Sequence, residues 1–188
     1  MPELPEVETV KRVLEPIVKG RKIVKIDVLR ATIVNNRAET FIPYFESEQF
    51  LSISRIGKFL IFHLTNDKVL ISHLRMEGKY IELLENEDNT KYARVVFHLD
   101  NNHKLCYDDS RSFGRMIISN EKDYRNEKEI AKLGPEPFNV SNVDPILKQV
   151  RKVSLPIKTA LLSQEIIRNE NRFPCSRSII RRTYHENR

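Results

Sequence analysis

The sequence predicts an α+β fold, in which an N-terminal antiparallel β-sandwich with flanking helices precedes an incomplete helical domain. Short apolar segments recur between residues 59 and 118, and turn signals such as Asn66-Asp67 and Asp100–Asn102 separate several of them. Strands this short and this regularly interrupted are typical of antiparallel sandwiches. Near the N-terminus and again after residue 133, the apolar residues follow helical spacing instead.

The first expected element is an amphipathic helix. Apolar residues recur at helical spacing near the N-terminus, with charged residues between them, at Val7, Val10, Leu14 and Ile17. Gly20 follows as a helix stop, since glycine readily adopts the backbone conformation that ends a helix. A strand should come next, because Val24, Ile26 and Val28 alternate with charged residues, which is the period of a half-buried strand.

The remaining strands of the expected sandwich are the apolar segments Phe59–Phe62, Val69–Ile71, Ala93–Phe97, Leu105–Tyr107 and Met116–Ile118. The segment Leu133–Phe138 then interrupts the strand pattern with two prolines. Helical spacing follows at Val143, Ile146, Leu147 and Val150. We therefore expect a sandwich domain at 1–132, a helical domain at 133–164, which the family resemblance described below implies is partial, and a disordered Arg-rich tail at 165–188, which diverges from that family.

Charge and composition narrow the function classes. The chain has 188 residues, enough for a proper hydrophobic core, and its net charge of +6 favours an anionic partner without separating DNA from RNA or a membrane surface. No apolar run is long enough to span a bilayer, and no basic leader is present, so we expect a cytosolic protein. Cys106 and Cys175 lie far apart, which excludes a disulfide framework or a four-cysteine zinc site built from this chain alone.

The first six residues carry the chemistry that the sequence predicts. Removal of Met1 would leave Pro2 as a free secondary amine, with the carboxylates of Glu3 and Glu6 close by. An unprotonated terminal amine can form a Schiff base, and its ordinary pKa of roughly 8 lies closer to neutrality than that of lysine. The alternative is structural: Pro2 and Pro5 begin a helix, and the two glutamates favour its positive end.

The opening segment Pro2–Val10 resembles the N-terminus of the bacterial formamidopyrimidine-DNA glycosylases, base-excision enzymes that remove oxidised purines. The sister family of oxidised-pyrimidine glycosylases, similar to endonuclease VIII, usually has glycine at the position of Leu4, so the purine branch is favoured. The resemblance implies that Pro2 attacks C1′ of the damaged nucleotide and that Glu3 works as acid and base. Glu6 would support this site.

Arg55–Phe59 is similar to the Arg-x-Gly-Lys segment of the same family. The resemblance implies that Lys58 lies in the active site near the lesion and its phosphate, where a cation would help to keep the Pro2 amine neutral. The segment Ser72–Gly78 resembles another part of the family, a His-Leu-x-Met-x-Gly loop, and this resemblance implies that His73 contacts a phosphate. Taken alone, Lys58 would be a solvated side chain at a strand edge, and a single histidine is more often structural.

Ser72–Gly78 and Asp109–Gly114 resemble the two loops that the family inserts into the duplex. The resemblance implies that Met76 fills the space of the ejected nucleotide, that Arg111 reads the orphaned base and that Phe113 enters between bases. From the residues alone, a methionine near a glycine indicates core plus turn. A glycosylase needs wedges of this kind, because extruding a nucleotide costs stacking energy of a few kcal/mol.

The C-terminal part carries a shorter resemblance. Ile157–Gln164 resembles a helix of the family's helix-two-turn-helix domain, and its Lys158 is a further DNA-binding candidate. The family continues with a Gly-x-Gly-Asn segment and a four-cysteine zinc finger, whereas this chain continues with an Arg-rich stretch. A reading-frame change after Gln164 would explain the difference, and a natural Arg-rich nucleic-acid tail is the alternative. The apolar face at residues 146–150 is then expected to be exposed or imperfectly covered.

The function expected from the resemblance is an N-glycosylase with abasic-site lyase activity, acting on 8-oxoguanine and formamidopyrimidines in double-stranded DNA through a Schiff base on Pro2. We expect a monomer that needs no metal or other cofactor to break the bonds. The alternative is a catalytically inactive remnant that binds DNA at most nonspecifically.

Overall fold

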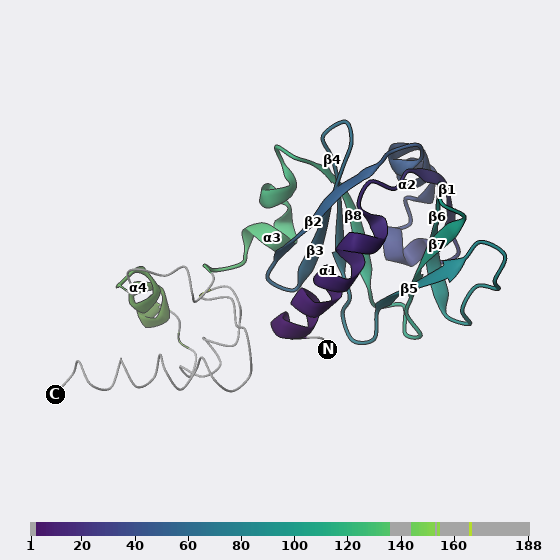
Figure 1. Cartoon of the computed structure of the whole chain (residues 1–188). Helices are drawn as coiled ribbons and strands as arrows, with labels where there is room; N and C mark the ends of the chain where they lie inside the picture. The colour runs from purple at the N-terminus through teal and green to yellow at the C-terminus, as the bar shows by residue number, and fades with distance from the viewer. Residues whose placement is uncertain (1–2, 136–143, 153, 155–165, 167–188) are drawn as a thin grey trace. The chain divides into compact units, whose positions relative to one another are not determined.

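The structure, a computed structural model, describes residues 3–135, 144–152, 154 and 166. The chain divides into two compact units, Met1–Arg125 and Asn126–Arg188. The first unit contains every strand of the described part of the chain (Figure 1). The domain boundary that the sequence predicts, between residues 132 and 133, lies a few residues after this division.

Two four-stranded antiparallel sheets form the first unit, which confirms the predicted sandwich. One sheet has the order β1 (Ile23–Val28), β6 (Ala93–Leu99), β7 (His103–Asp108) and β5 (Lys79–Leu84). The other has the order β2 (Phe50–Ile56), β3 (Phe59–Leu64), β4 (Lys68–His73) and β8 (Arg115–Asn120). Each of the five apolar segments falls within a strand, whereas β2 and β5 are strands that the pattern did not predict, because polar residues interrupt their apolar ones.

Helices and 3-10 turns accompany the sheets. Helix α1 spans Leu4–Val18, as predicted, and Gly20 follows it with a φ of +78°, a conformation that favours glycine. After β1 come η1 (Ala31–Val34) and α2 (Ala38–Phe45), which the apolar pattern did not reveal. The second unit contains α3 (Lys128–Ala131) and α4 (Asp144–Lys152), and η2 (Tyr124–Asn126) lies at the division.

The expected alternation in β1 is wrong at its first residue. Val24 is 51% exposed, whereas Ile23 is completely buried. The pairing of β1 with β6 shifts register between Ile23 and Lys25, which indicates a bulge. A bulge inserts one extra residue, so side chains before and after it no longer alternate regularly between the two faces. Ile23 and Ile26 therefore both point into the core, and Val24 points outward.

The predicted turn between β3 and β4 is confirmed. Asn66 and Asp67 both adopt left-handed conformations, with φ of 55° and 56°. Two such residues are the pattern of a type I′ hairpin, and asparagine and aspartate tolerate it better than most side chains.

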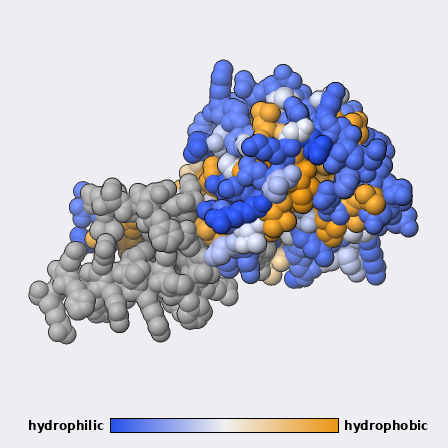
Figure 2. Space-filling model, in the orientation of Figure 1, coloured by the Kyte–Doolittle hydropathy of each residue, from blue (hydrophilic) through white to orange (hydrophobic). Residues whose placement is uncertain are grey.

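The core between the sheets is rich in aromatic side chains, and α1 and α2 contribute to it. Phe41 packs on Phe45 with ring centroids 5.0 Å apart, and Phe50 lies 5.8 Å from Phe62 and 6.2 Å from Phe97. Full burial of each phenylalanine contributes roughly 1.5–3 kcal/mol. Hydrophilic residues cover much of the face of the sandwich in Figure 2, with apolar patches between them.

Helix α4 lies where helical spacing predicts one. Ile146 is 4% exposed, and Leu147 and Val150 are half-buried. The expectation of an exposed face is therefore wrong for Ile146. Val143, the predicted helix at 157–164 and the tail lie outside the described residues, apart from Ile166. No helix in the described part of the chain combines the length and apolar character needed to cross a bilayer.

Candidate functional site

Helix α1 begins at the carboxylates that the sequence singles out. Glu3 is its N-cap residue, and the backbone N–H of Glu3 donates a hydrogen bond to the Glu6 carboxylate at 2.8 Å. Pro5 occupies the first turn, where its missing N–H costs no hydrogen bond. Glu6 is also in the first turn, so its charge lies near the positive end of the helix dipole. Pro2 itself lies outside the described residues.

Lys58 lies beside Glu3. The Nζ atom of Lys58 is 2.6 Å from Oε2 of Glu3, and the Lys58 side chain is only 6% exposed. The turn from β2 to β3 makes this possible: Gly57 has a φ of +57°, which suits the first residue of a type II′ hairpin turn and is strained for any other residue type. The alternative of a solvated lysine at a strand edge is therefore wrong.

A second ion pair supports the same turn. The Nε atom of Arg55 donates to Oε2 of Glu8 at 3.0 Å, and its Nη1 donates to the carbonyl of Gly57 at 2.9 Å. Burial favours a higher pKa for Glu8, but the hydrogen bonds from Arg55 and Arg12 and nearby positive charge outweigh it, so the pKa lies below its ordinary value. Glu8 was not among the site residues predicted from the sequence. Its spacing of three and four residues from Lys11 and Arg12 on the same helix indicated ion pairs, but not the contact with Arg55.

His73, at the end of β4, is buried and neutral. Its ring packs edge-on against Phe59 at 4.5 Å, and its Nδ1 accepts the backbone N–H of Arg75 at 3.0 Å. Burial, together with the positive charges of Arg75 and Lys58, lowers the pKa of His73 to about 3. Contact with a phosphate remains a prediction, and a neutral ring could make it only through the N–H at Nε2.

The two loops between strands carry exposed apolar side chains. Met76 is 45% exposed and Phe113 is 53% exposed, so the interpretation of Met76 as a core residue is wrong. The guanidinium of Arg111 lies 5.1 Å from the centre of the Phe113 ring. Glu77 connects the loops, because its carboxylate accepts the hydroxyl of Ser110 and lies 3.9 Å from Nη1 of Arg111.

A buried tyrosine beneath the loops explains the two glycines. A Cβ atom added to Gly78 would lie 2.2 Å from the hydroxyl of Tyr107, and one added to Gly114 would lie 1.8 Å from it. Tyr107 on β7 is fully buried, so both loops need glycine to approach it. The buried Asp109 carboxylate also accepts the N–H groups of Arg111 and Gly114, at 3.1 and 2.8 Å.

No cluster of three or more histidine, cysteine, aspartate or glutamate side chains suited to a metal ion occurs among the described residues. Cys106 on β7 does not fit a zinc site: it is buried, its thiol faces the side-chain oxygen of Asn89 at 3.9 Å, and burial raises its pKa, which disfavours the thiolate that zinc requires. The other cysteine and Lys158 lie outside the described residues.

Residues 1–116 match the model of the formamidopyrimidine-DNA glycosylase N-terminal domain, which is more than half of the chain. The chain belongs to the formamidopyrimidine-DNA glycosylase family. This confirms the resemblance drawn from the N-terminal segment and the three internal motifs.

Curated members of the family agree with this assignment. The chain is 40% identical to a formamidopyrimidine-DNA glycosylase of Listeria innocua over 169 residues, covering 89% of this chain and 62% of the relative. It is also 40% identical to one from Lactobacillus gasseri over 171 residues, covering 89% and 61%. The chain thus spans about three fifths of the length of these relatives.

Solved family structures share the fold. The Lactococcus lactis Fpg in complex with DNA containing an abasic site has a TM-score of 0.82 and 33% identity, over 89% of this chain and 62% of that one. The same enzyme bound to DNA containing N7-benzyl-Fapy-dG also has a TM-score of 0.82, with 34% identity and the same coverage.

Proposed function

We propose that this chain is a DNA glycosylase of base-excision repair that removes oxidised purines and then nicks the abasic site. The observation that carries the proposal is the ion pair between Glu3 and Lys58, whose charged atoms are 2.6 Å apart. Glu3 directly follows Pro2, the expected amine nucleophile. Family membership supports the same chemistry. Because its substrate would be damaged chromosomal DNA, the protein would act in the bacterial cytosol, at the nucleoid.

The proposed reaction begins at the Pro2 nitrogen, after removal of Met1. Its lone pair attacks C1′ of the damaged nucleotide and the bond from C1′ to the base breaks; the base leaves with a proton, and the closed sugar ring stays bound through C1′ to the Pro2 nitrogen, which loses its proton. Glu3 then gives a proton to the ring oxygen as the C1′–O4′ bond breaks, which converts the link to Pro2 into an iminium ion, and it accepts protons in the eliminations that follow. Lys58 holds the Glu3 carboxylate in position, and its positive charge disfavours protonation of a nearby amine.

The loops supply the step that must precede chemistry. C1′ and the base cannot be reached inside a stacked duplex, so the nucleotide has to be extruded. Met76 and Phe113 already expose their apolar side chains before DNA binds, and the half-exposed Arg111 lies beside the Phe113 ring, 3.9 Å from the Glu77 carboxylate. These three side chains would replace the lost stacking and contact the orphaned base.

Borohydride trapping tests the proposal. The chain, with Met1 removed, is incubated with abasic-site DNA and reductant, and the covalent protein–DNA adduct is quantified. We expect an adduct that disappears when the terminal amine is blocked by a retained Met1. An adduct that survives blocking but disappears in Lys58→Ala would assign the nucleophile to Lys58 instead. If no variant forms an adduct while duplex binding persists, the chain is an inactive DNA-binding remnant and the proposal is wrong.

A further inference from the structure

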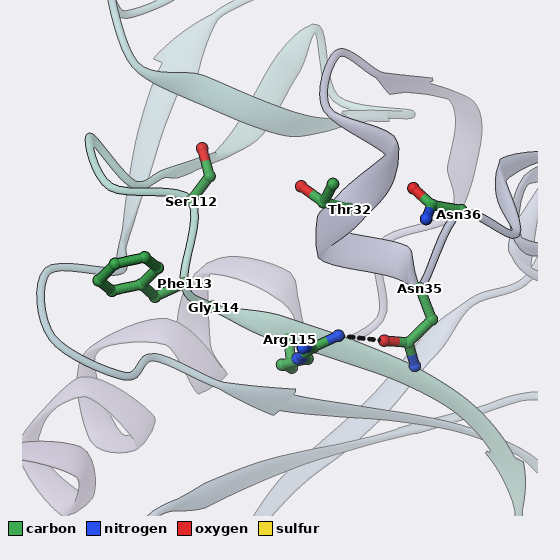
Figure 3. A pocket seen from close by; sticks show the side chains of 7 residues that line it. All are labelled: Thr32, Asn35, Asn36, Ser112, Phe113, Gly114 and Arg115. Carbon is green, nitrogen blue, oxygen red and sulfur yellow. Dashed lines mark hydrogen bonds between the residues drawn. The ribbon is translucent and has the colours of Figure 1, made fainter.

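A polar pocket lies next to the loop that carries Phe113. It has a volume of about 380 Å³ and is lined by residues of the segment after β1 and of the loop before β8: Thr32, Asn35, Asn36, Ser112, Phe113, Gly114 and Arg115. Figure 3 shows the side chain of Asn35 pointing toward Arg115, with Thr32 and Ser112 on facing segments. Of the residues that line this pocket, only Phe113 has a role in the proposed function.

Among the described residues, no carboxylate neutralises the positive charge of this pocket. Arg115 is the one charged residue that the described part of the chain contributes to its lining. Nη1 of Arg115 donates to Oδ1 of Asn35 at 2.6 Å, a neutral acceptor. No carboxylate among the described residues forms an ion pair with Arg115, whereas Lys58 is paired with Glu3 and Arg55 with Glu8. An exposed guanidinium held by an amide alone favours an anionic ligand.

The hydrogen-bond donors around Arg115 suit phosphate oxygens. A guanidinium has five N–H groups and no acceptor, so the Asn35 oxygen must face it and the Asn35 NH₂ group remains available to donate. The amide of Asn36 and the hydroxyls of Thr32 and Ser112 add neutral donors. Arginine with neutral donors around it is a common way to bind a phosphodiester.

Left-handed backbone occurs on both sides of the pocket, where Asn35, Asn36 and Ser112 have φ values of 54°, 58° and 55°. This conformation is common for asparagine, and Asn35 adopts it as the residue that ends η1, so the two asparagines shape the pocket without marked strain. The three left-handed residues lie on two segments about 80 residues apart in sequence, joined by the Arg115–Asn35 hydrogen bond.

We propose that this pocket binds a backbone phosphate of the DNA strand into which Phe113 inserts, with Arg115 as the main contact and Asn35 as the residue that positions it. The inference rests on the proposed function for the identity of the ligand. Phe113 and Arg115 are two residues apart, so a base step entered by the aromatic ring would bring its adjoining phosphate to the pocket. The contact would anchor that strand while the other strand's nucleotide is extruded.

The first test compares two arginine substitutions with the same change in net charge. Arg115→Gln removes the proposed contact, and Arg21→Gln removes an exposed arginine at the other end of β1. Binding to a duplex containing an abasic-site analogue is measured by fluorescence anisotropy at several salt concentrations. For Arg115→Gln we expect about tenfold weaker binding and a salt slope smaller by about 1, with little change for Arg21→Gln. Equal effects of the two variants would overturn the inference.

The second test locates the phosphate. Neutral methylphosphonate linkages are placed one at a time along each strand of the duplex, and binding is measured for the unmodified chain and for Arg115→Gln. We expect one linkage, next to the base step opposite the lesion, to weaken binding of the unmodified chain and to have no effect on Arg115→Gln. If every linkage affects both proteins alike, Arg115 contacts no phosphate.

A further measurement separates failure of the pocket from failure of the proposed function. If the unmodified chain does not bind the duplex, the proposed function is wrong. Titration with the trinucleotide d(TTT), followed through the side-chain amide resonances of Asn35 and Asn36, then tests the pocket directly. Shifts that disappear in Arg115→Gln support a phosphate site, and unchanged resonances overturn it.

Discussion

The Glu3–Lys58 pair and the two loops that carry Met76 and Phe113 are built in opposite ways. At the pair, the important charges are close together and the lysine side chain is 6% exposed. In the loops, the important side chains are about half exposed, and the rigid parts, Tyr107 and Asp109, lie beneath them. Bond breaking needs charges held in fixed positions before the substrate arrives, whereas extrusion needs apolar groups that can enter the duplex.

Replacing Glu3, the proposed acid of the Glu3–Lys58 pair, should have the largest effect. Glu3→Gln keeps a hydrogen-bond acceptor for Lys58 but cannot transfer a proton, so adduct formation with abasic-site DNA should slow by about 100- to 10,000-fold. Quench-flow trapping measures the rate. Glu39→Gln, at an exposed position on α2, is the matched control and should be unaffected. A loss below tenfold for Glu3→Gln would show that the pair is structural.

The stability of the protein should depend on the close packing of the two loops over Tyr107. Gly114→Ala places a Cβ atom 1.8 Å from the Tyr107 hydroxyl, so we expect it to lower the free energy of unfolding by about 2–3 kcal/mol. Gly20→Ala, whose added Cβ meets nothing within 4 Å but whose φ is +78°, should cost only about 1 kcal/mol. Urea denaturation measures both.

Tyr107→Phe removes the hydroxyl group that the methyl group of Gly114→Ala would contact first. The double variant Gly114→Ala with Tyr107→Phe should therefore lose less stability than the sum of the two single variants. Simple additivity would mean that Tyr107 is not what requires glycine at position 114.

Truncating the exposed side chains should separate stability from extrusion. Met76→Ala and Phe113→Ala should change the free energy of unfolding by less than about 0.5 kcal/mol, because both residues are about half exposed and lie on the surface of the loops. Each should slow processing of a damaged duplex by about tenfold or more, since lost wedge contacts raise the cost of extrusion. Reaction with an abasic site in single-stranded DNA should hardly change. Equal losses on both substrates would contradict the wedge role.

His73 connects the two regions, because it lies where β4 leads into the Met76 loop and also near Lys58. Burial, together with the charges of Arg75 and Lys58, lowers its pKa to about 3. The unfolded chain, with an ordinary histidine pKa near 6.5, binds a proton that the folded chain does not. Stability should therefore fall as the pH decreases from about 6.5 toward 3, by up to about 1.4 kcal/mol per pH unit, and this contribution should be complete above pH 6.5.

Denaturation of the parent chain and of His73→Gln at pH 7, 6 and 5 tests this effect. The carboxylates of Glu8, Asp27 and Glu48, whose pKa values are lowered in the folded chain, affect stability mainly at pH values below this range. The variant should show the smaller pH dependence. An unchanged slope would mean that His73 takes up its proton over the same pH range in the folded and unfolded chains, and a phosphate contact through its charge would then be possible below that range.

The sequence predicted the sandwich well because its strands are short, apolar and separated by strong turn residues. It missed β2 and β5, in which serine, arginine, lysine and glutamate interrupt the apolar pattern. It also placed Val24 inward, since a bulge leaves no mark in the alternation itself. The candidate residues came from local motifs, and each motif is contained in fewer than ten consecutive residues.

By itself, the sequence determined the family, the helix beginning at the two glutamates, most strands and the residues available for chemistry, because these depend on short-range order along the chain. Only the tertiary structure decided which of these residues meet. Three contacts join segments that are far apart in sequence: the Lys58–Glu3 pair, the Tyr107 hydroxyl beneath Gly78 and Gly114, and the hydrogen bond from Arg115 to Asn35. Sheet pairing brings such segments together, and whether a charge gains a partner depends on that pairing and not on its neighbours in the chain.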